Sequence, residues 1–125
     1  MNQLSHDKKN VLVIDDEPVI CELLEDVLEM LGFNPMTYSS PLDAIDVYRG
    51  LNQKVYFVIM DMMMPMMNGQ ELFIEMRQIN PDVKVVVLSG YSMINKIDDM
   101  LKNGVVGFLQ KPVTINQLTD IIRKI

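Results

Sequence analysis

Short apolar runs alternate with amphipathic stretches along the chain. The runs are four to six residues long, which is too short for a buried helix and typical of strands covered on both faces. A proline in the second run indicates a strand near the edge of the sheet. We expect strands over Val11–Ile14, Pro35–Tyr38, Val55–Met60, Val83–Leu88 and Val105–Leu109.

Between these runs, apolar residues recur at the spacing of one helix face. The first expected helix runs from near Pro18 to Gly32, and the second from Ser40-Pro41 to Gly50. The third begins after Gly69 and ends before Pro81, and the fourth runs from near Ile94 to Gly104. The last begins at the capping box of Thr114. Their inward-facing residues include Val19, Leu24, Leu28, Ile45, Tyr48, Leu72, Phe73, Met76, Ile94, Ile97, Leu101, Ile115, Leu118 and Ile122. Strands alternating with helices of about 10–14 residues predict an α/β fold, a (βα)₅ doubly wound parallel sheet with helices on both faces.

Length and composition narrow the class of protein. The chain has 125 residues, 49% of them hydrophobic, which suits one compact domain over residues 10–125 behind a short polar tail over residues 1–9. The net charge of −6 disfavours direct binding to nucleic acid, and no apolar run reaches the ~18 residues of a membrane span. The N-terminus has no apolar secretion signal, and the single Cys21 has no disulfide partner. These features favour the cytoplasm.

Four of the predicted strands end in polar residues. Asp15-Asp16 follow the first strand, Asp61 the third, Ser89 the fourth and Lys111 the fifth. Because the carboxyl ends of parallel strands lie on one edge of the sheet, where ligands bind in such folds, these side chains can converge.

The chemistry of this set is coherent. Clustered carboxylates repel one another, which raises a pKa or requires a cation. Oxygen ligands without histidine or cysteine suit Mg²⁺. A carboxylate can also act as a nucleophile and form an aspartyl-phosphate, while a serine hydroxyl and a lysine ammonium bind the phosphoryl oxygens.

Structural roles remain as alternatives for each residue alone. Asp15, Asp16 and Glu17 could cap a helix, and Asp61 could cap the segment that follows it or sit in a turn. Ser89 could belong to a turn, and Lys111 could lie in a solvated loop. His6 lies in the tail with no ligand pattern around it, and Cys21 is expected to be an inert, partly buried thiol. The methionines from Met62 to Met67 could suggest a soft-metal site, but without histidine or cysteine we expect a packed loop and helix start.

The combination resembles one family, from about Asn10 to Ile125. The residues that carry it are Asp15-Asp16-Glu17-Pro18, Asp61 with Met64-Pro65-x-Met67-x-Gly69, Leu88-Ser89-Gly90, and Phe108-Leu109-Gln110-Lys111-Pro112. With these motifs the chain is similar to the receiver domain of two-component response regulators, of the chemotaxis-regulator type. The resemblance implies a flavodoxin-like five-stranded sheet in the order 2-1-3-4-5.

The resemblance also implies roles for individual residues. Asp61 looks like the phosphoacceptor, with Asp16 and Asp61 as direct Mg²⁺ ligands, Asp15 acting largely through water and the Met63 carbonyl as a further ligand. Lys111 matches the lysine that contacts the phosphoryl group. The expected switch pair is Ser89, which detects the phosphoryl group, and Phe108, which turns inward on activation.

The implied partners are a histidine kinase or a histidine phosphotransfer protein, and an effector that binds the surface formed by the fourth helix, fifth strand and fifth helix. The implied protein is a phosphorylation-dependent switch rather than an enzyme. The sequence is compatible with a single-domain regulator and with a receiver cut from a larger regulator or hybrid kinase.

Two other classes share parts of the pattern. A flavodoxin-type electron carrier has the same sheet, but it needs a phosphate-cradling loop where this chain has Asp15-Asp16-Glu17-Pro18. A haloacid-dehalogenase-type phosphatase also uses an aspartate nucleophile, but it needs a second aspartate where this chain has Met63.

Overall fold

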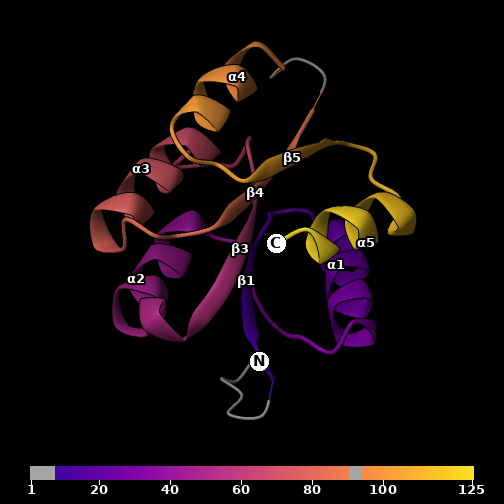
Figure 1. Ribbon diagram of the computed structural model, residues 1–125. Helices are drawn as coiled ribbons and strands as arrows, with labels where there is room; N and C mark the ends of the chain where they lie inside the picture. Colours follow the sequence, from indigo (N-terminus) through magenta and orange to yellow (C-terminus); the bar gives the residue numbers. More distant parts are fainter. Residues whose placement is uncertain (1–7, 91–93) are drawn as a thin grey trace.

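The computed structural model describes residues 8–90 and 94–125, and it shows the predicted alternation of strands and helices (Figure 1). Most of the expected N-terminal tail, including His6, lies outside these residues. The predicted inward positions of Ile94 and Ile97 also lie outside the described part of the chain, because only the backbone is described over residues 94–97. The elements are β1 (Asn10–Ile14), α1 (Pro18–Met30), β2 (Asn34–Tyr38), α2 (Pro41–Leu51), the 3₁₀ helix η1 (Asn52–Lys54), β3 (Val55–Asp61), α3 (Gly69–Ile79), β4 (Val85–Ser89), α4 (Ile94–Lys102), β5 (Gly107–Gln110) and α5 (Ile115–Arg123).

The five strands form one parallel sheet in the order β2-β1-β3-β4-β5, so the predicted fold and strand order are confirmed. Helices α1 and α5 cover one face of this sheet, and α2, α3 and α4 cover the other (Figure 1). Each face carries its own apolar core, with Phe57 and Ile59 of β3 facing α1 and α5, and Val58 and Met60 facing the other layer. β3 therefore runs through the centre of the molecule.

The register of the strands brings their carboxyl ends to one edge of the sheet. Ile14 of β1 pairs with Met60 of β3, and Asp61 pairs with Leu88 of β4. Ser89 in turn pairs with Gln110 of β5. The polar residues that end these strands consequently lie side by side along the edge.

Capping boxes mark the beginning of α3 and of α5, and the Ser40 hydroxyl caps α2. Thr114 and Gln117 form the predicted capping box at the start of α5. A second capping box, between Asn68 and Glu71, begins α3. Because Asn68 fills this role, Asp61 is not the cap of the following helix and its carboxylate is available to the edge of the sheet.

Several details differ from the prediction. Helix α2 continues through Gly50 to Leu51 and passes into η1, because glycine tolerates a helical backbone where packing supports it. On α4 it is Met100 that is buried, whereas Leu101 is exposed, because an apolar pair leaves the rotation of a helix open by one residue. Val19 and Ile115 are also exposed, and β4 and β5 begin two residues later than predicted. Over the described ranges, no helix is both long and apolar enough to cross a membrane.

Candidate functional site

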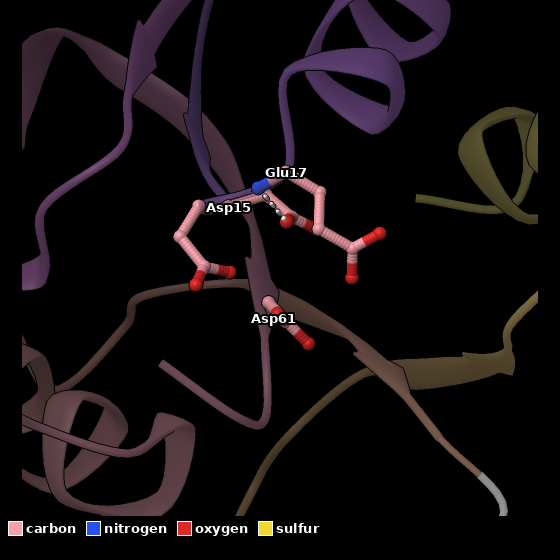
Figure 2. A group of neighbouring side chains, drawn as sticks. Asp15, Glu17 and Asp61 are labelled. Atoms are coloured by element: carbon pink, nitrogen blue, oxygen red, sulfur yellow. Dashed lines mark hydrogen bonds between the residues drawn. The ribbon is translucent and has the colours of Figure 1, made fainter. Parts of the chain in front are cut away.

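Three elements deliver charged side chains to the carboxyl edge of the sheet. Asp15 directly follows β1, Asp61 is the last residue of β3, and Lys111 directly follows β5. In Figure 2, Asp15 and Glu17 come from the segment after β1 and Asp61 from the end of β3. Both aspartates are buried, at 0% and 3% exposure. Two strand ends that are distant in the sequence thus place carboxylates in one shielded position.

Lys111 bridges these carboxylates. Its Nζ lies 3.0 Å from Oδ2 of Asp15, 3.3 Å from Oδ2 of Asp61 and 2.9 Å from Oε1 of Glu17. The backbone N–H of Lys111 donates to the carbonyl of Ser89 at 2.8 Å, which holds the lysine against the end of β4. The structure therefore brings Asp15, Asp61 and Lys111 together as predicted, and it adds Glu17, whose role as a partner of Lys111 was not predicted.

The other carboxylate oxygens are oriented by the backbone. Oδ1 of Asp15 accepts the N–H of Glu17 at 2.9 Å, and Oδ1 of Asp61 accepts the N–H of Met63 at 3.3 Å. Oδ2 of Asp15 is fully buried and, although close to the lysine ammonium, accepts no hydrogen bond of good geometry. A buried carboxylate oxygen in this state has unused capacity to bind a cation.

The donor set fits Mg²⁺. Carboxylate oxygens of Asp15, Asp16, Glu17 and Asp61 all lie within 4.8 Å of one another. Asp16 and Glu17 are exposed whereas the other two are buried, so the group opens to solvent on one side. Mg²⁺ prefers oxygen ligands, usually takes only one or two carboxylates and keeps several waters, which this half-open arrangement permits.

Burial and like charge perturb the carboxylates. Burial, reinforced by the charge of Asp15, raises the pKa of Asp61 to about 6, against the opposing effect of Lys111. Burial also raises the pKa of Asp15 above its ordinary value, although the Glu17 amide and Lys111 oppose the shift. Burial alone would lower the pKa of Lys111, but its contacts with Glu17, Asp15 and Asp61 raise it, so the lysine stays charged. The site thus has an excess of negative charge that a bound cation would relieve.

The two predicted switch residues lie at different depths. Ser89 is fully buried, and its Oγ donates to the carbonyl of Gly90 at 3.3 Å. Phe108 is 37% exposed and pairs with Val87 through the backbone of β5. Ser89 therefore lies at the edge of the sheet that carries the site, whereas the Phe108 ring is at the surface.

The methionine segment after β3 is only partly packed. Met62 is fully buried, whereas Met63 is 58% and Met66 81% exposed, and Met66 has a positive φ of 76°. The expectation of a packed loop is correct for Met62 and wrong for Met63 and Met66, because the loop turns outward before α3. Cys21 is partly buried, as expected; burial, with the charge of Asp15 next, raises its pKa to about 11, which makes it a weak nucleophile.

Comparisons with known proteins agree with this geometry. The family model for the response regulator receiver domain matches residues 11–123. The autoinducer 1 sensor kinase/phosphatase LuxN of Vibrio campbellii is 31% identical over 126 residues, which cover 96% of this chain and 14% of LuxN. The transcriptional regulatory protein GlrR of Escherichia coli is 31% identical over 119 residues, which cover 95% of this chain and 26% of GlrR. The chain therefore spans about one seventh of the length of LuxN and about a quarter of that of GlrR.

A solved structure gives the same result for the fold. A response regulator receiver domain protein from Clostridium thermocellum superposes with a TM-score of 0.87 at 30% sequence identity, covering 92% of this chain and 91% of that chain. The family model, the sequence relatives and this structure all match over nearly the whole chain. The protein belongs to the family of response regulator receiver domains.

Proposed function

We propose that Asp61 is the phosphoacceptor of this receiver domain, and that phosphorylation switches the surface that a downstream partner binds. The observation that carries the proposal is the position of Asp61: a buried carboxylate at the end of the central strand, with Oδ2 3.3 Å from the ammonium of Lys111. Asp15 shares that lysine but follows β1, and its side chain is fully enclosed, whereas the Asp61 side chain keeps 5% of its surface exposed. Both Oδ1 atoms accept a backbone amide, but the Glu17 amide lies 2.9 Å from Asp15 and the Met63 amide a longer 3.3 Å from Asp61. Asp61 is thus the carboxylate best placed for nucleophilic attack.

The proposed donor is a phosphohistidine of a histidine kinase or a histidine phosphotransfer protein. A carboxylate oxygen of Asp61 attacks phosphorus, the new P–O bond forms, and the P–N bond breaks with its electron pair left on the imidazole nitrogen. Lys111, already at the acceptor, pairs with the incoming phosphoryl oxygens. LuxN is named as a sensor kinase and GlrR as a transcriptional regulator, so matching domains occur on both sides of a signalling pathway. We place the phosphorylated domain in the cytoplasm.

Asp15, Asp16 and Asp61 would hold Mg²⁺, with the Met63 carbonyl as a further ligand. When bound, the ion offsets the charge of the carboxylates and of the incoming phosphoryl group. The buried Oδ2 of Asp15, which pairs with Lys111 but accepts no well-aligned hydrogen bond, and the all-oxygen donor set support this assignment. The buried Asp15 and Asp61 would bind the inner side of the ion, and the exposed Asp16 would bind it on the side that faces solvent.

The proposed output surface comprises α4, β5 and α5. It exposes apolar side chains on successive elements, with Leu101 38%, Phe108 37% and Ile115 50% exposed. A contiguous apolar patch indicates contact with a protein partner, and we propose that these three side chains belong to one. Ser89, whose carbonyl binds the Lys111 amide, would connect the phosphoryl group to this surface, and Phe108 would take the space that the serine vacates.

The test is phosphorylation with acetyl phosphate and Mg²⁺, followed by mass-spectrometric mapping. We expect one phosphoryl group on Asp61, none on the Asp61→Asn variant, and little reaction in EDTA. Asp26→Asn, which removes an exposed carboxylate from α1, is the matched control and should react like the wild type. Wild-type labelling of Asp61→Asn would overturn the assignment, and undiminished labelling in EDTA would overturn the role of Mg²⁺.

A further inference from the structure

The edge of the sheet opposite Asp61 carries the reverse charge. A lysine stands directly before each of three adjacent strands, with Lys9 before β1, Lys54 before β3 and Lys84 before β4. Because the strands are parallel, these lysines gather at the end where the chain enters β1 (Figure 1). Arg123, the last residue of α5, lines the same hollow as Lys9. We call these four residues, with Tyr56 between them, the basic strip.

Two ammonium groups converge on one aromatic ring in this strip. Nζ of Lys9 lies 4.1 Å and Nζ of Lys84 lies 5.2 Å from the centre of the Tyr56 ring. Phe33 stacks on the same tyrosine with 6.1 Å between the ring centres. Each exposed cation–π contact contributes about 0.5–1 kcal/mol, but the two positive charges also repel each other. The arrangement concentrates positive charge over an apolar base.

Between described residues, no ion pair involves Lys9, Lys54, Lys84 or Arg123. The protein as a whole carries a net charge of −6. An uncompensated positive region on an acidic protein attracts anionic ligands locally.

The strip is also concave. A hollow of about 680 Å³ is lined by Leu31, Phe33 and Arg123 as well as Lys9 and Tyr56. A second hollow of about 420 Å³ is lined by Lys54 and Val55 and shares Lys9 and Tyr56 with the first. Two hollows with a common wall suit an extended ligand that crosses Tyr56 better than a compact one.

We propose that the basic strip is a docking surface for an extended acidic segment of a partner protein. An apolar side chain of that segment would enter the larger hollow against Phe33 and Leu31, and its carboxylates would pair with Lys9, Lys54 and Lys84. The basic strip lies at the opposite end of the sheet from Asp61, so binding of this segment should not require phosphorylation.

Charge and ring geometry favour a peptide over a nucleic acid. Stacking of a base requires an open aromatic face, and Tyr56 is already contacted by Lys9, Lys84 and Phe33. A nucleic acid would also extend beyond the strip onto the acidic remainder of the surface. A narrow acidic peptide avoids this repulsion, because surface charges are screened beyond about 8–10 Å at physiological salt.

The test uses the full chain labelled with ¹⁵N and a pentapeptide in which one phenylalanine stands between two pairs of glutamates. We expect amide shifts that cluster at Lys9, Phe33, Tyr56, Lys84 and Arg123, and an affinity that falls about tenfold from about 20 mM to about 200 mM NaCl. The same peptide with glutamine in place of glutamate should produce no such cluster. Absence of the cluster, or equal binding of the glutamine peptide, would overturn the proposal.

Two lysine variants locate the site. Lys84→Glu should weaken the glutamate peptide about fivefold, whereas Lys102→Glu, the same charge change at an exposed position on α4, should weaken it less than about twofold. Equal effects would show that only net charge matters and would refute the site. Tighter binding of a short oligothymidylate, or of vesicles that contain phosphatidylserine, at the same residues would refute the acidic peptide as the ligand.

Discussion

Gly69 packs so closely against Asp61 that a Cβ atom at position 69 would lie 2.8 Å from the Asp61 carbonyl oxygen. The N–H of Gly69 also donates to the carbonyl of Met62 at 2.9 Å. The start of α3 is therefore pressed onto the end of β3, at the residue whose carboxylate forms the centre of the site. Glycine at this position is required by the close approach of two backbone segments.

The first prediction is that Gly69→Ala damages both stability and phosphorylation. The added methyl group must displace backbone atoms, which we expect to cost about 1–3 kcal/mol of unfolding free energy. Displacement of Asp61 should also slow phosphorylation by acetyl phosphate about tenfold, because the reaction depends on its position. Chemical denaturation and the rate of phosphoprotein formation measure the two effects.

Gly50→Ala is the matched control for this prediction. Gly50 lies in α2, and a Cβ there meets no atom within 4 Å. Alanine is the better helix former, so this variant should be more stable by about 0.5–1 kcal/mol and should be phosphorylated normally. If Gly69→Ala behaves like Gly50→Ala, the close approach does not constrain the site.

The second prediction is that Asp61→Asn stabilises the protein in the absence of Mg²⁺. Burial and the charge of Asp15 raise the pKa of Asp61 from 3.8 to about 6, so the folded state binds this proton more tightly than the unfolded chain. The contribution to stability is therefore complete below pH 4 and is lost as the pH rises through 6. At pH 7.5 the ionised carboxylate should cost about 2–3 kcal/mol, which the amide would avoid.

Denaturation in EDTA at pH 4 and pH 7.5 tests the predicted direction of this pH dependence. The difference between Asp61→Asn and the wild type should be largest at pH 7.5 and small at pH 4. Asp26→Asn should change stability by less than about 0.5 kcal/mol at either pH. If Asp61→Asn is less stable than the wild type at pH 7.5, ionised Asp61 does not destabilise the folded state and the prediction is wrong.

The sequence predicts the fold and the position of the site at the carboxyl edge of the sheet, because both depend on topology. Once the strands are parallel, Asp15, Asp61 and Lys111 must reach the same edge wherever their side chains point. The exposed Leu101 and buried Met100 could not be assigned, because neighbouring apolar residues leave the rotation of α4 undetermined. The contact of Glu17 with Lys111 depends on one side-chain rotamer, which no periodicity encodes.

The third prediction concerns that contact. Glu17 competes for the Lys111 ammonium at 2.9 Å, so Glu17→Gln should leave the lysine more available to the phosphoryl group. Because the Glu17 side chain is 58% exposed, we expect only about a two- to fivefold increase in the rate of phosphorylation by acetyl phosphate. Glu22→Gln makes the same charge change on an exposed part of α1 and should have a smaller effect. An equal effect of both variants would assign the change to net charge instead.

The fourth prediction is that Ser89 couples phosphorylation to the proposed output surface. Its side chain is fully buried, its carbonyl accepts the Lys111 amide at 2.8 Å, and Gln110 of β5 is its strand partner. A phosphoryl group on Asp61 that attracts the Ser89 hydroxyl would therefore act directly on β5, where Phe108 lies at the surface. Ser89→Ala should still accept phosphate, since Asp61 and Lys111 remain, but its response at β5 should be weak.

Amide shifts over residues 98–110 on phosphorylation provide the measurement. In Ser89→Ala we expect them to fall to about half of the wild-type values or less, which corresponds to a loss of at least about 0.4 kcal/mol in coupling free energy. Ser39→Ala, at an exposed hydroxyl outside the site, should respond like the wild type. Phe108→Ala should keep the amide shifts near Ser89 and lose those beyond β5, because the Phe108 ring is proposed to move only after the Ser89 hydroxyl has moved. Wild-type shifts in Ser89→Ala would show that the phosphoryl group reaches α4 and β5 by another route, most directly through Lys111.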